Sequence, residues 1–383
     1  MADAGNNPTA GVDIGEVKQA VLDHLWMPFT QHNDLAEAGG PLVIVEGDGV
    51  RIKDSDGKSY IDGIGGLFLV NVGHGRQEIV DAVTEQLSNI HYANTFSYAT
   101  IPTANLATKL AELAPGDLNK VFLASGGSEA VDTALKIARQ YHVNRGEPQR
   151  TKLIARRGSY HGVSLGALSV NSWEYVQRSV WEPMLANVRF VGPTAEEVEE
   201  LIEFEGPETF AAFITEPVSI TKGVVVPPDD YWPKMREICD KHGILLIADE
   251  VINGFGRTGK MFAIEHWGVT PDLMTFAKGV TSGYQPVGGV MAGPKVTDAF
   301  VGEHEKTFTH GYTYSGHPAG AAAALANLEI IERENLVENA ADVGNYMLDQ
   351  LSALKEHSMV KEVRGIGLLA AVELVKDKAT GEP

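Results

Sequence analysis

Gly243-Ile-Leu-Leu-Ile-Ala-Asp-Glu-Val251 is a short apolar run that ends in two carboxylates, and the fold of this chain follows from runs of this kind. A second run, Leu273-Met-Thr-Phe-Ala-Lys-Gly279, ends in a lysine, and further runs occupy residues 120–124, 152–155, 188–191 and 211–215. Helical patterns lie between most of them. This alternation predicts an α/β fold with a mostly parallel sheet and helices on both of its faces. Ligands of such sheets bind at the carboxyl ends of the strands.

The segments on either side of these runs have other patterns. A helix is predicted over residues 14–25, and short antiparallel strands are predicted over residues 42–52 and 59–62. After the last apolar run, the chain predicts an alanine-rich helix over 320–334, a second helix to about residue 357 and a strand over 368–374. The length of 383 residues allows one large domain and a smaller one.

Composition narrows the class of protein. The formal net charge is −20, from 31 basic and 51 acidic side chains, which disfavours binding to nucleic acid or to anionic membranes. The single cysteine, Cys239, cannot form an internal disulfide and is expected to be a core residue. The N-terminus has no signal-peptide pattern, and no apolar run approaches the roughly 20 residues that span a bilayer. We therefore expect a cytoplasmic protein.

Asp249 stands where a buried strand ends, and a buried carboxylate needs a partner. It could cap a helix or form a salt bridge. A metal ligand is a further possibility, but no His or Cys cluster accompanies it at ligand spacing, so no metal is expected. A counter-ion for a protonated ring nitrogen is another interpretation, and it stands beside the helix cap and the salt bridge.

Lys278 ends a wholly apolar run and precedes a glycine, which is unusual for a solvated lysine. Desolvation would lower its pKa and make it an amine nucleophile and base. A lysine that bonds an aldehyde and an acidic partner for a pyridine nitrogen are what pyridoxal phosphate requires. Lys278 and Asp249 together therefore indicate this cofactor.

Two further segments suit the same cofactor. Ser125-Gly126-Gly127-Ser128 opens a helix, where backbone N–H groups and the helix dipole favour an anion such as phosphate, although an ordinary helix start has the same pattern. Tyr160 follows the run at 152–155 and could stack on a planar ring, or merely anchor its loop.

In this order and spacing, the segments resemble one family, the class III, fold type I, pyridoxal-phosphate aminotransferases. The resemblance runs from about Leu25 to the end of the chain. It is carried by Ser125-Gly-Gly-Ser-Glu-Ala130, Tyr160-His-Gly162, Glu216-Pro217, Asp249-Glu-Val-Ile-Asn-Gly-Phe-Gly-Arg-Thr-Gly259, Lys278-Gly279 and His310-Gly-Tyr-Thr-Tyr-Ser-Gly-His-Pro318.

The resemblance implies a role for each matching residue. Lys278 would bond the aldehyde and shuttle the proton between the substrate carbon and the cofactor. Asp249 would keep the ring nitrogen protonated. Val251 and Tyr160 would pack on the two faces of the ring, and Glu216 would lie near its edge groups.

The phosphate would be held from two subunits. Gly127 and Ser128 of one subunit would bind it, and Thr313 of the second would reach it, which makes a dimer the minimal functional unit. The dimer could pair further into a tetramer. Arg257, within the Asp249 segment, is interpreted as a structural loop arginine.

Within the family, the chain is most similar to the omega-amino acid or amine:pyruvate transaminases. Segments that begin at Trp26, Gly66 and Tyr312 carry this likeness. Trp26 and Phe68 are expected in the substrate pocket, and many members have tryptophan where this chain has Phe68. Ser125-Gly126 also stands where Asn-Ser is common.

The resemblance also predicts a domain scheme. Residues 1–70 would contribute to a small domain, 71–318 would form the large cofactor-binding domain, and 319–383 would be the C-terminal part of the small domain. Family chains continue for several tens of residues beyond Glu373-Leu-Val375 and there supply an arginine for the substrate carboxylate. The small domain is therefore expected to be truncated here.

The leading hypothesis is a transaminase that moves an amino group from an omega-amino acid or amine to an oxo acid such as pyruvate, in two half-reactions through pyridoxamine phosphate. An aminomutase or decarboxylase on the same cofactor is an alternative. A non-catalytic homologue that keeps the fold is another.

Overall fold

The computed structural model describes residues 9–382, and the chain divides into two compact units, Met1–Gln77 and Glu78–Pro383. The first unit contains a three-stranded antiparallel sheet in the order β1-β2-β3. Its elements are α1 (Ile14–His24), α2 (His32–Glu37), β1 (Ile44–Asp48), β2 (Arg51–Asp54), β3 (Ser59–Ile61) and α3 (Gly65–Phe68). Asp13 caps α1, since its carboxylate accepts hydrogen bonds from the amides of Gly15 and Glu16. The predicted helix and the antiparallel pairing are confirmed, but the region predicted over 42–52 contains a turn that separates β1 from β2.

The second unit is built on a seven-stranded sheet in the order β4-β10-β9-β8-β7-β5-β6. The strands are β4 (Lys120–Ala124), β5 (Lys152–Arg156), β6 (Val188–Val191), β7 (Phe210–Thr215), β8 (Leu245–Asp249), β9 (Leu273–Phe276) and β10 (Gly288–Ala292). Every residue of β7, β8 and β9 is buried, as expected for strands covered on both faces. All six predicted strands are present, and their ends lie within two residues of the predicted ones.

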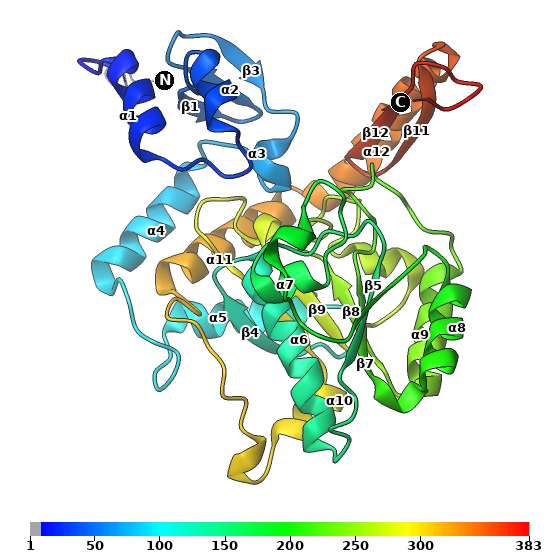
Figure 1. The fold of residues 1–383 in the computed structure, drawn as a ribbon. Coiled ribbons are helices and arrows are strands. Elements are labelled where there is room, and N and C mark those ends of the chain that lie inside the picture. The colour runs from blue at the N-terminus through cyan, green and yellow to red at the C-terminus, as the bar shows by residue number, and fades with distance from the viewer. Residues whose placement is uncertain (1–8, 383) are drawn as a thin grey trace. The chain divides into compact units, whose positions relative to one another are not determined.

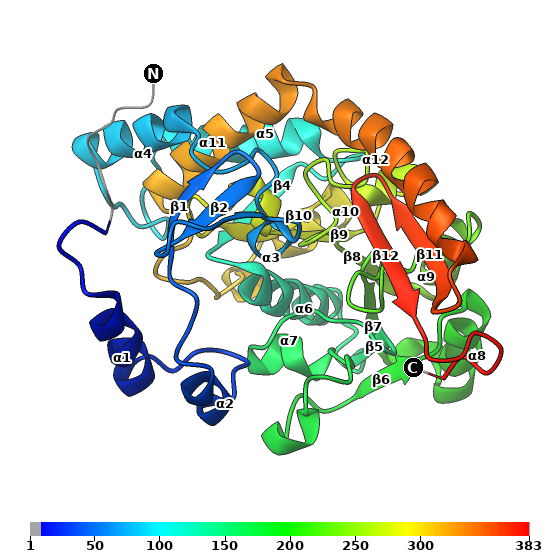
Figure 2. The same ribbon diagram turned by 90° about the horizontal axis from the view of Figure 1, so that it is seen from above.

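Helices cover both faces of this sheet (Figures 1 and 2). α6 (Gly127–Asn144) lies along one face and packs on the central strands, while α9 (Tyr231–His242) packs on β8 from the other side. The other α-helices of the unit are α4 (Gln77–Asn89), α5 (Ile101–Leu113), α7 (Leu165–Ser169), α8 (Ala195–Glu205), α10 (Pro294–Thr297), α11 (Pro318–Arg333) and α12 (Leu336–Ser352). Short 3-10 helices occupy Arg178–Trp181, Pro207–Thr209, Ala263–Trp267, Lys278–Val280, Asp298–Phe300, His304–Lys306 and Ala353–Glu356.

One strand of the sheet was not predicted. β10 runs antiparallel to both of its neighbours, β4 and β9, whereas the other six strands are parallel to one another. It begins with Gly288 and Gly289, which weaken any strand pattern in the sequence. The structure requires these glycines, because a Cβ on Gly289 would lie 2.3 Å from the carbonyl oxygen of Phe122.

The chain ends in a hairpin of β11 (Val360–Ile366) and β12 (Leu369–Leu374). The predicted strand at 368–374 is confirmed, and β11 is its unpredicted partner. The hairpin turn rests on the loop after β8, since the Leu368 amide donates to the carbonyl oxygen of Arg257 at 3.1 Å. A Cβ on Gly344 of α12 would lie 2.2 Å from the oxygen of Gly367 in this turn. The predicted grouping of 319–383 with 1–70 in a small domain stays a prediction.

Candidate active site

Lys278 follows β9, with only Ala277 between the strand and the lysine. Its φ of 49° lies in the left-handed region, a strained conformation for a residue with a side chain that is found most often at functional sites. Burial lowers the pKa of its amine to about 8; the Asp249 carboxylate opposes this shift, and the Arg257 guanidinium adds to it. More of this amine is therefore neutral near pH 7 than in an exposed lysine, so that it can act as a nucleophile or base.

Asp249 ends β8 directly beside Thr275 of β9 and is 3% exposed. Its Oδ1 accepts hydrogen bonds from the Thr275 hydroxyl at 2.9 Å and from the Val251 amide at 3.2 Å. Its Oδ2 lies 2.6 Å from Nδ1 of His161. These contacts orient the carboxylate at the edge of the sheet that also carries Lys278.

No role was predicted for His161 from the sequence. It is 3% exposed, and because a carboxylate only accepts hydrogen bonds, its Nδ1 is the donor to Asp249. Burial opposes a charge on the ring, but the hydrogen bond and negative charge of Asp249, together with the charge of Glu216, outweigh it and raise the pKa of His161. The sequence feature from which a role could have been predicted is the position of His161 next to Tyr160, just after a strand.

Tyr160 and Glu216 meet beside this pair. The Tyr160 amide donates to Oε1 of Glu216 at 3.4 Å, and Glu216 is 4% exposed. Burial and the charge of Asp249 raise the pKa of the Tyr160 phenol, so Asp249 acts on Tyr160 as well as on Lys278. The Tyr160 ring packs edge-on against Trp173, with ring centres 5.6 Å apart.

The start of α6 forms a cradle next to the end of β8. A Cβ on Gly127 would lie 2.8 Å from Cγ1 of Val251, and a Cβ on Gly162 would lie 2.4 Å from Oγ of Ser128. Oγ of Ser128 accepts a hydrogen bond from the Val163 amide at 3.1 Å and keeps its own hydrogen for another acceptor. The N-terminal amides of a helix and the helix dipole favour an anion at such a position.

Three predicted site residues are not brought to this edge by the described contacts. Trp26, which is 88% exposed, and Phe68 both belong to the unit Met1–Gln77. Thr313 is exposed, and its carbonyl oxygen accepts a hydrogen bond from the Tyr92 hydroxyl at 2.7 Å. The roles predicted for these three residues stay predictions.

The backbone of Arg257 contacts the hairpin turn, since its carbonyl oxygen accepts a hydrogen bond from the Leu368 amide, and the role of its side chain stays a prediction. Burial lowers the pKa of its guanidinium to about 10. Because its charge also lowers the pKa of Lys278, the guanidinium acts on the site electrostatically. Cys239 is fully buried in α9, and burial raises its pKa to about 12, as expected for an inert core thiol.

One group of potential metal ligands occurs in the part of the chain that the structure describes. It consists of Glu199, Glu203 and His242, on α8 and at the end of α9. The Lys241 ammonium already lies 2.7 Å and 3.2 Å from oxygens of the two glutamates. His242 also precedes β8 in the chain, at the opposite edge of the sheet from Asp249. Among residues 9–382, no helix has the length and apolar character that crossing a membrane requires.

Known proteins are similar to this chain in sequence and in fold. The family model described as Aminotransferase class-III matches residues 35–382. The putrescine–pyruvate aminotransferase of Pseudomonas aeruginosa is 41% identical over 379 residues, which cover 94% of this chain and 82% of that protein.

Solved structures agree with this result. An (S)-enantioselective omega-transaminase from Thermomicrobium roseum is 45% identical, with a TM-score of 0.92 over 97% of this chain and 86% of that one. The omega-transaminase from Pseudomonas jessenii in complex with PMP is 37% identical, with a TM-score of 0.92 over 96% of this chain and 85% of that one.

Proposed function

The chain belongs to the class III aminotransferases, and from this premise we propose that it transfers an amino group from an amine or omega-amino acid to an oxo acid such as pyruvate. Enzymes of this family use pyridoxal phosphate. When bound, this cofactor supplies an aldehyde that bonds amino groups and a ring that withdraws electrons from the substrate carbon. Pyruvate is the acceptor in the name of the Pseudomonas aeruginosa relative.

The residues at the sheet edge fit this cofactor. Gly127 and Gly162 pack so closely on Val251 and Ser128 that neither position has room for a Cβ, and the amides at the start of α6 would bind the phosphate. Asp249, oriented by Thr275 and His161, would face the ring nitrogen. Val251, which packs against Gly127, and Tyr160 would lie on the two faces of the ring.

Lys278 would bond the aldehyde and move the proton. Its Nζ must be neutral to take a proton from the substrate carbon, and a pKa of about 8 brings it close to that condition at neutral pH. The juxtaposition of this amine with Asp249, on neighbouring parallel strands, is the observation that carries the proposal.

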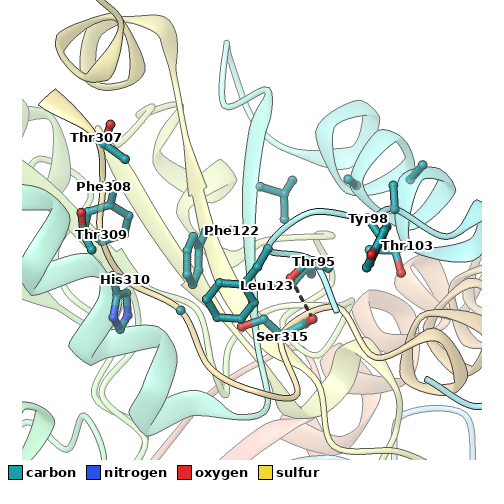
Figure 3. A pocket seen from close by; sticks show the side chains of 16 residues that line it. Thr95, Tyr98, Thr103, Phe122, Leu123, Thr307, Phe308, Thr309, His310 and Ser315 are labelled. Atoms are coloured by element: carbon teal, nitrogen blue, oxygen red, sulfur yellow. Dashed lines mark hydrogen bonds between the residues drawn. The ribbon is translucent and has the colours of Figure 1, made fainter. Parts of the chain in front are cut away.

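We also propose that the functional unit is a homodimer. A pocket of about 640 Å³ opens between the segments around residues 95–107, 121–123 and 307–315 (Figure 3). In Figure 3, Phe122 and Leu123 of β4 lie between Thr95 and the irregular segment Thr307–His310. Phe96, Tyr98 and Tyr314 are exposed in the same region, and aromatic side chains of this kind are enriched at interfaces. A second copy that covers these side chains would bring the active site of that copy toward Thr313.

The cytoplasm is the compartment that we propose, because the chain has a single, buried thiol.

The visible absorption spectrum tests the function directly. We expect a band when purified protein is mixed with pyridoxal phosphate, its loss on addition of putrescine or β-alanine, and its return on addition of pyruvate. Release of carbon dioxide in place of this cycle would indicate a decarboxylase. A band that responds to no donor or acceptor would contradict transamination.

A further inference from the structure

Arg156 is a buried cation that the proposed reaction does not use. It ends β5, at the carboxyl edge of the sheet, and is 4% exposed. Within residues 9–382, no carboxylate lies within ion-pairing distance of its guanidinium; its central carbon lies 5.8 Å from the ring centre of Tyr231. A buried charge without a close partner is strongly destabilising unless other polar groups or water surround it.

Glu216 is a buried anion in a matching position. β5 and β7 are parallel neighbours with Ala155 opposite Ile214, so Arg156 and Glu216 lie at the same sheet edge on adjacent strands. Oε1 of Glu216 has one long hydrogen bond, from the Tyr160 amide at 3.4 Å, and Oε2 has no described donor. The two opposite charges therefore belong to neighbouring strand ends, and within residues 9–382 no direct ion pair joins them.

Several buried polar atoms around these two groups share one property: none has a hydrogen-bond partner among the described protein atoms. They are Nη2 of Arg156, Oγ of Ser159, Nε2 of His161, Oγ1 of Thr215, Oε2 of Glu216, Oγ of Ser219 and Oη of Tyr231. All come from the ends of β5 and β7, the loops that follow them and the start of α9. Buried polar atoms that lack protein partners are bridged by ordered water, which typically makes two to four hydrogen bonds.

The charges of this cluster act on one another. Glu216 raises the pKa of His161 and Arg156 lowers it, although burial and the contact with Asp249 have larger effects. At the other side of the cluster, burial raises the pKa of Tyr231 to about 12. The charge of Arg156 and a side-chain contact between the two groups, too poorly aligned to count as a full hydrogen bond, oppose that rise. A continuous electrostatic environment therefore extends from Tyr231 to Asp249.

We propose that Arg156 and Glu216 form a water-bridged ion pair that acts on Asp249 through His161, and that Arg156 is a positioning residue of the reaction. With His161 protonated, two cations balance the two buried carboxylates, Asp249 and Glu216. The pair thereby sets the charge of His161 and the strength of its Nδ1–H hydrogen bond to Asp249, the carboxylate that would face the cofactor ring. The predicted effect on turnover rests on the proposed function, whereas the ion pair and its effect on His161 do not.

Proton NMR of the cofactor-loaded protein tests the network. The Nδ1–H hydrogen of His161, in a 2.6 Å contact, should resonate downfield of the amides, and His161→Gln assigns it by its loss. The charged groups that face His161 are Asp249, Glu216 and Arg156. The ring keeps Nδ1–H on the carboxylate and titrates at Nε2, so the pH midpoint at which this resonance shifts reports the pKa of His161. Arg156→Met removes a repelling cation, so this midpoint should rise. Glu216→Gln removes an attracting anion, so the midpoint should fall, each by roughly one unit.

Two further variants separate charge from shape. The double variant Arg156→Met with Glu216→Gln should return the midpoint close to that of the parent, and Arg156→Lys should preserve it. Turnover supplies the second measurement: Arg156→Met should lower kcat roughly tenfold, the equivalent of one pKa unit, without changing the KM of the amine donor.

Shifts of the same sign in the two single variants, or no shift in either folded variant, would overturn the proposal. If Arg156→Met fails to fold, Glu216→Gln alone must still lower the midpoint, and an unchanged midpoint counts against the network. The NMR signal needs no substrate. Absence of transamination with the predicted midpoints would therefore sink the proposed function and leave the network standing.

Discussion

The lysine at the end of β9 combines an unusual backbone with an unusual side chain. Its left-handed φ places the residue in a single tight turn at the strand end. The same position buries the amine close to Asp249 and Arg257, which have opposing effects on its pKa. Burial is the larger effect, so the amine gains a proton only below about pH 8. The reactivity of the Lys278 amine therefore depends on the position at which β9 ends.

The reaction of the cofactor-free protein with pyridoxal phosphate should depend on pH through this amine. Because only neutral amine attacks the aldehyde, the second-order rate of capture should rise roughly tenfold per pH unit below about pH 8 and level off above it. Stopped-flow absorbance measures this rate. Lys278→Ala should remove the covalent capture and nearly all turnover while the protein stays folded. A midpoint near 10.5, the ordinary lysine value, would contradict the depressed pKa.

Among the elements, α6 illustrates how a helix start becomes a binding site. Gly126 and Gly127 are adjacent, yet a Cβ would meet nothing within 4 Å at Gly126 and would meet Val251 at 2.8 Å at Gly127. Of the two, only Gly127 is assigned to the phosphate, and only its Cβ would meet the residue that would pack on the ring. The two positions therefore differ in what a methyl group would disturb.

Gly127→Ala should weaken pyridoxal phosphate binding roughly tenfold, since the β-branched Val251 side chain has little freedom to move aside. Gly126→Ala is the matched control, with an extended backbone at φ −177° and open space for its methyl group, and should bind like the parent. Fluorescence titration of the cofactor-free variants gives both affinities. Equal losses in the two variants would show that Val251 does not matter for the cradle.

Most of the sheet and much of the site could be predicted, because the evidence for them is local. Apolar runs that end in Asp249 and Lys278 mark strand ends without any knowledge of neighbours. The Asp249–His161 contact and the Arg156 cluster escaped prediction, because they depend on the order in which strands lie beside one another. β10 escaped for a related reason: its glycines follow from crowding by Phe122 and by Phe276, which the sequence does not display.

Crowding around β10 leads to a stability prediction. Gly289→Ala should lower the free energy of unfolding by about 1–3 kcal/mol, because the methyl group would meet the Phe122 carbonyl oxygen at 2.3 Å and the Phe276 ring at 2.7 Å. Denaturant unfolding followed by tryptophan fluorescence measures the change. Gly63→Ala, with nothing within 4 Å of its Cβ, is the control and should stay close to the parent. Similar stability of the two variants would argue against close packing at β10.

For the whole molecule, the proposed dimer can be tested by mixing two inactive variants. If Thr313 completes the site of the partner subunit, a mixture of Lys278→Ala and Thr313→Asp chains should form hybrids with one intact site in two. Activity should appear after subunit exchange and approach roughly a quarter of the parent value for random pairing, because half of the dimers are hybrids. A mixture that stays inactive, while sedimentation detects hybrids, would place Thr313 in the site of its own chain.

The antiparallel strand β10 determines the distance between the anion cradle and Lys278. Since it lies between β4, which leads into the anion cradle, and β9, which leads to Lys278, two interstrand steps separate those strands, or about 10 Å. Without it, β4 and β9 would be adjacent, and the cradle and the amine would be only about 5 Å apart. β10 therefore sets the separation between the anion cradle and the Lys278 amine. Only a ligand whose anionic group and aldehyde are a matching distance apart would reach both.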